Sequence, residues 1–322
     1  MMMLPLMAVA QEVTLLRQRA FPKTVAAGNY SGIAWLGGSS YAVVNDKSPT
    51  AGFYLMTIET DSATGELLTV REDSFLTCGL PNRDEEGICY VPQTRTLWIS
   101  GEADGQILEY DLQGQLTGRK LQIPPIFSTA YANGGFEALT YQAQTHRFWT
   151  TSEFTLQADG ELPSLQNRVR NRLRLQSFSD GMVPMEQYWY ETDSTTVTKK
   201  KGRSVLGVSG LAALSDGRIV VLERELYFPK RKIGSKACVK LYLVDPQKQQ
   251  QGERLEKRLL TEFRTKINLT RRSFANYEGI CVGPVLSDGR QLLLLVCDSQ
   301  NQSHGMLKDW FRPVIIDLRA FP

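Results

Sequence analysis

The chain has 322 residues, 42% of them hydrophobic, with 37 basic and 34 acidic side chains and a net charge of +3. This length is enough for one large all-β domain with a sizeable core. Because the two signs of charge nearly balance, no broad field of one sign would attract a polyanion, and we expect no nucleic-acid partner.

The first ten residues, MMMLPLMAVA, are apolar, and Ala8-Val9-Ala10 has the small-x-small pattern of a secretory cleavage site. They are short for a signal peptide and lack its basic segment, so a start farther upstream is an open alternative. We interpret residues 1–10 as the remnant of a signal peptide and expect a periplasmic or secreted protein. No later segment of the sequence has the ~18 to 20 apolar residues of a membrane span.

A short motif of Ser or Glu, then Gly or Ala, then Ile or Leu, recurs five times, with copies starting at Ser31, Glu86, Glu137, Ser209 and Glu278. A turn and a β-rich run follow each copy, which is typical of a hairpin and not of a helix. Successive copies start 51 to 72 residues apart, room for one four-stranded blade with its loops. The repeat predicts an all-β fold, a single β-propeller of five four-stranded blades over residues 11–322, with six blades as the alternative.

The fifth repeat ends before its outer strand can form. A β-compatible run from Glu12 to Phe21 precedes the first motif and belongs to no other blade. We expect this run to complete the fifth blade, because closure of the ring removes exposed sheet edges that promote aggregation.

The first residue of each motif would project beside the central channel, at the start of an innermost strand. This predicts a ring of three carboxylates and two hydroxyls, from Glu86, Glu137, Glu278, Ser31 and Ser209. Carboxylates at short range raise one another's pKa and need a compensating charge. Because all donors are oxygen atoms, we expect Ca²⁺ in preference to Mg²⁺. Pairing of the glutamates with Arg83, Arg224 or Arg272 is the alternative.

An acidic residue also follows the second strand expected in each repeat: Asp46, Glu102, Glu153, Glu223 and Asp298. Three of them, Glu102, Glu153 and Asp298, are candidates to assist the attack of water on an ester, although these acids could equally mark turns. Arg224 and Arg272 are candidates to stabilise the negative charge that develops on the ester during hydrolysis.

The remaining candidates are histidines and basic segments. His304 is a further candidate base, whereas His146 lies in an expected surface turn. The basic segments 167–172, 230–236 and 271–272 would bind a phosphate or carboxylate if they fold over the acidic mouth, with solvated loops as the alternative.

Four segments carry a resemblance to a known family: GFEAL from Gly135, LERE from Leu222, NYEGI from Asn276 and LVCDSQN from Leu295. In them the chain resembles the esterase-like, phytase-like propellers, over about Asn29 to Leu318. The resemblance implies a propeller, often exported from bacteria, with hydrolytic activity on phosphate or other esters. Ala138 stands where glycine is usual and Cys297 where serine is expected, and neither change removes a carboxylate.

A serine hydrolase of the α/β type, a zincin and a P-loop enzyme are disfavoured, because the sequence has no G-x-S-x-G, H-E-x-x-H or G-x-x-x-x-G-K-[ST] motif. Five cysteines without C-x-x-C spacing argue against zinc, and Cys281 with Cys297 is a candidate disulfide. We expect a monomeric, calcium-dependent esterase or phosphoesterase that acts on a small-molecule ester at the central mouth. The alternative is a non-catalytic propeller that binds a ligand or partner and uses calcium to brace its blades.

Overall fold

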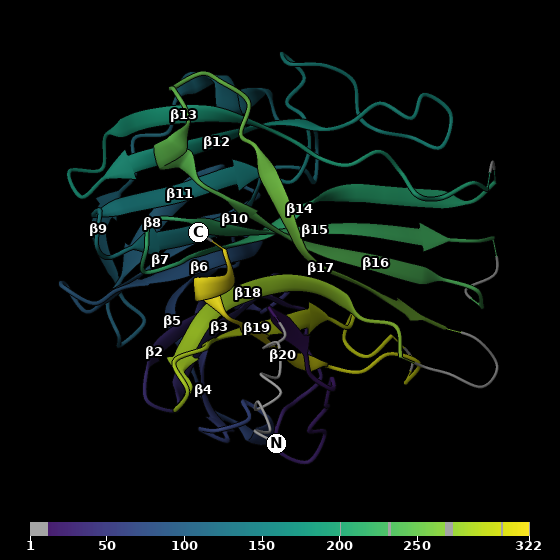
Figure 1. The fold of residues 1–322 in the computed structure, drawn as a ribbon. Helices are drawn as coiled ribbons and strands as arrows, with labels where there is room; N and C mark the ends of the chain where they lie inside the picture. Colours follow the sequence, from purple (N-terminus) through teal and green to yellow (C-terminus); the bar gives the residue numbers. More distant parts are fainter. Residues whose placement is uncertain (1–11, 200, 231–232, 268–272, 304, 322) are drawn as a thin grey trace, which may run out of the picture.

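A computed structural model describes residues 12–199, 201–230, 233–267, 273–303 and 305–321. In this part of the chain, twenty strands form five four-stranded antiparallel sheets arranged as the blades of a ring (Figure 1). The predicted five-bladed propeller is confirmed, and the six-bladed alternative is wrong. Among the described residues, no helix is both long enough and apolar enough to cross a membrane.

Each blade begins at the centre of the ring and ends at its outside. The innermost strands are β2 (Tyr30–Gly37), β6 (Glu85–Val91), β10 (Phe136–Gln142), β14 (Arg203–Ala213) and β18 (Asn276–Val285). Each of these contacts the innermost strand of the next blade, and β18 contacts β2, so the ring is closed. The second strands are β3 (Ser40–Asn45), β7 (Thr96–Gly101), β11 (Arg147–Ser152), β15 (Ile219–Phe228) and β19 (Gln291–Asp298).

The two outer positions of each blade also match the repeat. The third strands are β4 (Thr50–Thr60), β8 (Gln106–Tyr110), β12 (Arg172–Ser179), β16 (Lys236–Val244) and β20 (Phe311–Ile316). The outer strands are β5 (Leu67–Pro81), β9 (Leu116–Lys120), β13 (Pro184–Glu191), β17 (Lys257–Lys266) and β1 (Val13–Leu15). Three 3₁₀ turns, η1 (Pro125–Thr129), η2 (Pro246–Lys248) and η3 (Leu318–Ala320), lie between or after the strands.

The fifth blade is completed by the start of the described chain, as predicted. β1 pairs antiparallel with β20, with Val13 opposite Ile316 and Leu15 opposite Val314. Only three residues of the expected run form the ladder, and Arg19 adds an isolated bridge to Phe311. The ring is therefore closed by joining the two ends of the chain in one sheet.

Close contact between innermost strands explains the small residue at the centre of each motif. A Cβ atom on Gly32 would lie 2.2 Å from the carbonyl oxygen of Glu86 in the next blade, and one on Gly279 would lie 2.9 Å from that of Ser31. Side chains larger than hydrogen at these two positions would therefore push the blades apart. The packing fixes how the motif's first residues are placed around the channel.

All five cysteines are free, so the predicted disulfide is wrong. Cys281 pairs across the β18–β19 ladder with Leu294, whereas Cys297 pairs with Tyr277. The two cysteines thus occupy different rows of the same sheet and do not face each other.

The first two strands of the fourth blade are longer than those of the third blade, and they extend beyond the ring on one side. Its strands β14 and β15 have 11 and 10 residues, against 7 and 6 in β10 and β11. Figure 1 shows β14, β15 and β16 running out past the other blades on the right of the view. The extended strands contribute residues to the central site and to the outer surface.

Candidate functional site

In each blade, one residue of the second strand lies opposite the small residue of the motif, as Val44 lies opposite Gly32 in the first blade. The residue two places later in the sequence, Asp46 in the first blade, occupies an equivalent position in every blade. The residues at this position, blade by blade, are Asp46, Glu102, Glu153, Arg224 and Asp298. All five line one pocket at the mouth of the channel. The ring at this level thus has four acids and one arginine.

The fourth blade differs from the sequence expectation. Gly210 faces Leu222, so Arg224 takes the ring position and Glu223 does not. The Glu223 carboxylate lies on the opposite face of β15, where it accepts a hydrogen bond of 2.6 Å from the Tyr190 hydroxyl. It also pairs with Lys257 at 2.6 Å. The expectation that Glu223 follows its strand is wrong, because β15 continues to Phe228.

The mouth is a pocket of about 750 Å³. Among the described residues it is lined by seven carboxylates and three basic side chains: Asp46, Glu86, Glu102, Glu137, Glu153, Glu278 and Asp298, with Lys47, Arg203 and Arg224. All three motif glutamates therefore reach it. Ser31 and Ser209 line the narrow part of the channel below. Their hydroxyls donate to the carbonyl oxygens of Glu85, at 2.7 Å, and Tyr277, at 3.2 Å, and so join neighbouring innermost strands.

One side of the mouth is neutralised by a buried arginine. The guanidinium of Arg224 lies 2.5 Å from Glu278 and 2.8 Å from Glu153, and it also donates to the side-chain oxygen of Asn276. Burial opposes its charge, but the surrounding glutamates outweigh burial and raise the pKa of Arg224. Glu278, expected as a metal ligand, is therefore engaged by Arg224, which is the pairing that the sequence left as the alternative.

The opposite side holds carboxylates for which the described residues provide no such partner. Oxygen atoms of Glu86, Glu102 and Glu137 lie within 4.8 Å of one another. The backbone N–H of Gly135 donates to Glu102 at 3.0 Å. Glu86 and Glu137 are only 6% and 7% exposed, and their carboxylates accept no hydrogen bond from any described residue. Burial, followed by repulsion from neighbouring carboxylates, raises the pKa of both groups well above the ordinary range.

A second acidic group shares Glu86 with the first. Oxygen atoms of Asp46, Asp84 and Glu86 also lie within 4.8 Å of one another. Lys47 lies 3.1 Å from one oxygen of Asp46 and pairs with Asp84. The other oxygen of Asp46 is buried without a hydrogen-bond partner among the described residues. Burial raises the pKa of Asp46 to about 6, and Lys47 partly offsets this rise.

Two further acids complete the ring. Burial raises the pKa of Glu153 to about 7, although the charge of Arg224 lowers it in part. Asp298 is held by hydrogen bonds from the backbone N–H of Gln300, at 2.6 Å, and the side-chain amide of Asn276, at 3.4 Å. Glu153 is therefore suited to exchange a proton near neutral pH, whereas Asp298 is fixed by its donors.

Several sequence candidates lie elsewhere. Arg272 and His304 fall outside the described residues. His146 is in an exposed turn, 2.8 Å from Asp180, as expected. Arg83 pairs with Asp104 and not with a mouth glutamate. The basic segment 167–172 does not cover the mouth: Arg168 donates to the carbonyl oxygens of Thr195 and Val197, Arg170 lies near Glu191 and Arg172 stacks on Trp189.

The sequence analysis missed an apolar wall on the fourth-blade side of the mouth. It consists of Val205, Leu226, Phe228, Ile267, Phe274, Met306 and Leu307. The rings of Phe228 and Phe274 are 5.9 Å apart, and Leu226 and Phe274 belong to a small separate core. Leu226 and Phe228 occupy alternate positions in the sequence, a pattern that could have indicated that β15 extends past the ring.

A second pocket adjoins the mouth on the other side. It has a volume of about 480 Å³ and shares Glu102 and Asn133 with the mouth. Phe127, Tyr131 and Phe136 contribute aromatic lining. Glu102 therefore lies between the acidic mouth and a second pocket with an aromatic lining.

The geometry can be compared with known proteins. A family model described as "Phytase-like: Esterase-like activity of phytase" matches residues 25–300. The chain belongs to this phytase-like family. No curated protein matches the phytase-like chain.

Solved structures share only a distant likeness with this phytase-like propeller. A member of the DUF4221 family from Bacteroides vulgatus is 11% identical, with a TM-score of 0.44, covering 95% of this chain and 98% of that one. Streptogramin B lyase is 10% identical, with a TM-score of 0.38 and coverage of 95% and 98%. Hydrazine synthase of Kuenenia stuttgartiensis is 10% identical, with a TM-score of 0.40, and the match covers 86% of this chain but 58% of the synthase chain.

Proposed function

We propose that this phytase-like propeller is a divalent-cation-dependent hydrolase that acts on small-molecule esters at its central mouth. One observation carries the proposal: Glu86 and Glu137 are buried without hydrogen-bond partners among the described residues, and with Glu102 they form a group compact enough for one ion. Membership of a family described by esterase-like activity supports the same reading.

The donors fit calcium. The group offers only carboxylate oxygens, which Ca²⁺ accepts in a flexible geometry, whereas Mg²⁺ requires a stricter octahedron. Two carboxylates with raised pKa would regain their charge beside a cation, which accounts for their burial without other partners in the described part of the chain. A bound cation would supply Lewis-acid polarisation of the ester oxygen. The three ligands proposed are Glu86, Glu102 and Glu137, with Asp46 and Asp84 adjoining.

The other mouth residues have separate roles in this proposal. Glu153, with a pKa of about 7, accepts a proton from the attacking water. Arg224, which stays charged, stabilises negative charge on the substrate and holds Glu153 and Glu278 in place. Asn276 positions both Glu278 and Asp298, because its side-chain amide donates a hydrogen bond to each carboxylate.

The mouth favours an ester of low charge. Its described lining has seven carboxylates against three basic side chains, which would repel a substrate with several phosphates. The apolar wall, with Phe228, Phe274 and Leu307, offers a surface for an alkyl or aromatic group. We therefore propose an ester with an apolar group as the substrate class, in preference to a highly phosphorylated one.

A panel of carboxylate and phosphate esters tests the proposal, with each assay run in calcium and again in chelator. We expect calcium-dependent release from apolar carboxylate esters, and loss of that release in Glu102→Gln but not in Glu66→Gln, an exposed control. Calcium binding without turnover of any ester by the folded protein would refute the hydrolase and favour the non-catalytic propeller braced by calcium.

Export and a monomeric state complete the proposal. Residues 1–10, on which the export prediction rests, lie outside the described residues. Cell fractionation of the producing organism and sizing of the purified protein by light scattering test these two points. Protein retained in the cytoplasm, or a stable dimer, would overturn the respective claim.

A further inference from the structure

The projecting end of the fourth blade concentrates positive charge. Segments 197–206, 226–239 and 264–267 contain no acidic residue in the sequence. Five lysines in them are described and exposed: Lys199, Lys201, Lys230, Lys236 and Lys266. We call these five lysines, together with Ile233, the basic tip. The rest of the chain must carry a net negative charge to reach the total of +3, so charge is separated along the molecule.

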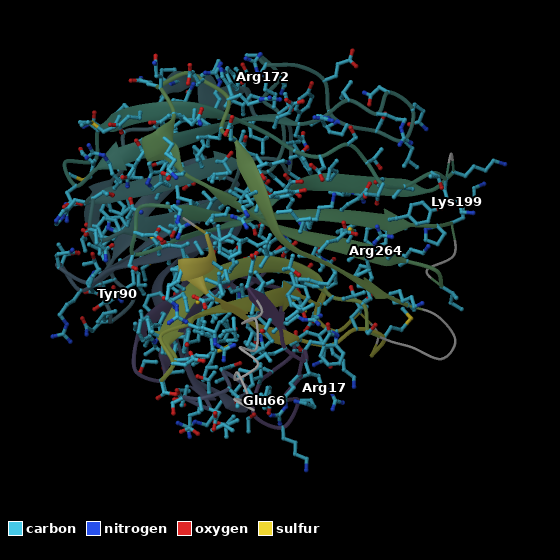
Figure 2. All side chains as sticks on the ribbon, in the orientation of Figure 1. Arg17, Glu66, Tyr90, Arg172, Lys199 and Arg264 are labelled. Carbon is cyan, nitrogen blue, oxygen red and sulfur yellow. The ribbon has the colours of Figure 1, made fainter. Side chains whose placement is uncertain are left out.

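The strand pairing places these lysines at one end of the sheet. Lys236 in β16 faces Tyr227 in β15 on one side and Lys266 in β17 on the other. The Tyr227 hydroxyl donates to the carbonyl oxygen of Lys201 at 2.8 Å, which ties the segment before β14 to the same end. Figure 2 labels Lys199 at the far end of the extension, with its side chain pointing outward. The basic tip is thus one surface and not a set of scattered charges.

The charges of the basic tip have no acidic partner among the residues that the structure describes. Within the described part of the chain, none of its five lysines takes part in an ion pair. By contrast, nearby Lys240 and Lys257, deeper in the same blade, pair with Asp193. A group of unpaired lysines at a projecting end attracts an anionic surface.

The basic tip also exposes a large apolar side chain. Ile233, in the turn between β15 and β16, is 58% exposed. A branched apolar side chain among lysines suits a lipid interface, where the apolar group enters the headgroup region and the amines contact acidic headgroups. A nucleic-acid site would instead need stacking aromatics or side chains that reach base edges in a groove.

We propose that the basic tip docks the protein on an anionic lipid surface. The end of the same blade forms the apolar wall of the mouth through Val205 and Phe228, and Arg203 lies where the wall meets the tip. Docking therefore brings the mouth close to the lipid surface. This inference does not require the mouth to be catalytic.

Cosedimentation with lipid vesicles tests the proposal. We expect the full chain to bind phosphatidylcholine vesicles that contain about 30% phosphatidylserine, and not vesicles of phosphatidylcholine alone. Binding should weaken strongly between about 0.1 M and about 1 M salt, because the Debye length falls from about 10 Å to about 3 Å. Reversal of three charges, in Lys199→Glu, Lys201→Glu and Lys230→Glu together, should lower affinity roughly tenfold or more.

A matched variant separates the basic tip from general charge. Reversal of three exposed lysines elsewhere, Lys23, Lys120 and Lys248, changes net charge equally and should leave most of the binding intact. Ile233→Ser should weaken binding even at low salt, because it removes the apolar contact. Equal loss in both triple variants, no vesicle binding, or binding to DNA without binding to vesicles would overturn the proposal. Unchanged melting temperatures would show that each variant is folded.

Discussion

Arg224 in β15 and Glu153, just after β11, form a buried ion pair of 2.8 Å between the fourth and third blades. The same guanidinium reaches Glu278 in the fifth blade. One arginine therefore joins three blades at the mouth and neutralises only one side of it. The other side is left with carboxylates that favour either protons or a cation.

Removal of Arg224 should destabilise the fold strongly. In Arg224→Met, Glu153 and Glu278 would remain buried without their cation, which should cost about 3–5 kcal/mol in the free energy of unfolding. Urea unfolding at about pH 8 measures this loss. Arg71→Met, which removes an arginine 61% exposed in its side chain, should cost less than about 1 kcal/mol. Similar losses in the two variants would contradict the role given to Arg224.

Stability without a cation should fall as pH rises. Burial raises the pKa of Asp46 to about 6 and of Glu153 to about 7, and it raises those of Glu86 and Glu137 well above their ordinary range. A carboxyl with a higher pKa in the folded state binds its proton more tightly there, so stability is lost as pH rises from about 4.3 through the raised value.

Thermal unfolding in chelator should therefore show a lower melting temperature at about pH 8 than at about pH 5. Calcium should restore the melting temperature at the higher pH and have little effect at the lower pH, where the carboxyls keep their protons. An unchanged or rising melting temperature over this range, in chelator, would show that these carboxyls are not destabilising when charged.

Glu137→Gln removes the charge of one carboxylate in the same cluster and nearly keeps the shape of its side chain. In chelator at about pH 8 this variant should be more stable than the wild type by roughly 1–3 kcal/mol, because an amide has no charge to bury. Calcium should no longer raise its melting temperature appreciably. A variant that is destabilised in chelator and still stabilised by calcium would place the ion elsewhere.

Two acids that the sequence placed in the ring, Glu223 and Glu102, should behave in opposite ways. Glu223→Gln breaks the ion pair with Lys257 within the fourth blade and should destabilise the fold by about 1–3 kcal/mol, yet leave ester turnover by the folded protein unchanged. Glu102→Gln should abolish turnover with a smaller effect on unfolding. Loss of turnover in folded Glu223→Gln would show that the ring includes that carboxylate.

The apolar wall should set the preference for acyl length. Phe228→Ala should lower kcat/KM for esters of long acyl chains about tenfold, while acetate esters should be hydrolysed as before, since they do not reach the wall. The comparison of the two substrates in one variant controls for general damage. An equal fall for both would indicate that Phe228 supports the fold and does not contact the substrate.

The fold followed from the sequence because the motif is repeated at a fixed place in every blade. Gly32 and Gly279 mark positions where a neighbouring backbone leaves no room for a side chain, and this constraint is visible as a recurring small residue. The closing strand was predictable for the same reason, since a ring leaves one strand unaccounted for.

The candidate site was predictable only in part, because β15 continues past the ring position and the end of the strand does not mark that position in the fourth blade. In the first blade the spacing from Gly32 to Asp46 is 14 residues, and the same spacing from Gly210 reaches Arg224, not Glu223. In the fourth blade, the acidic residue next to the ring position, Glu223, was therefore mistaken for the ring residue. The hydrogen bonds of Ser31 and Ser209 to neighbouring carbonyls depend on side-chain rotamers that a sequence pattern does not specify.

The most direct test of the account is the initial rate of hydrolysis of a neutral apolar ester as a function of calcium concentration, for the wild type and Glu137→Gln. The account predicts a saturable rise in rate for the wild type, reversed by chelator, and no rise for folded Glu137→Gln. Hydrolysis that proceeds equally in calcium and in chelator, or a calcium response that survives in Glu137→Gln, would contradict a cation-dependent site at the mouth of the channel.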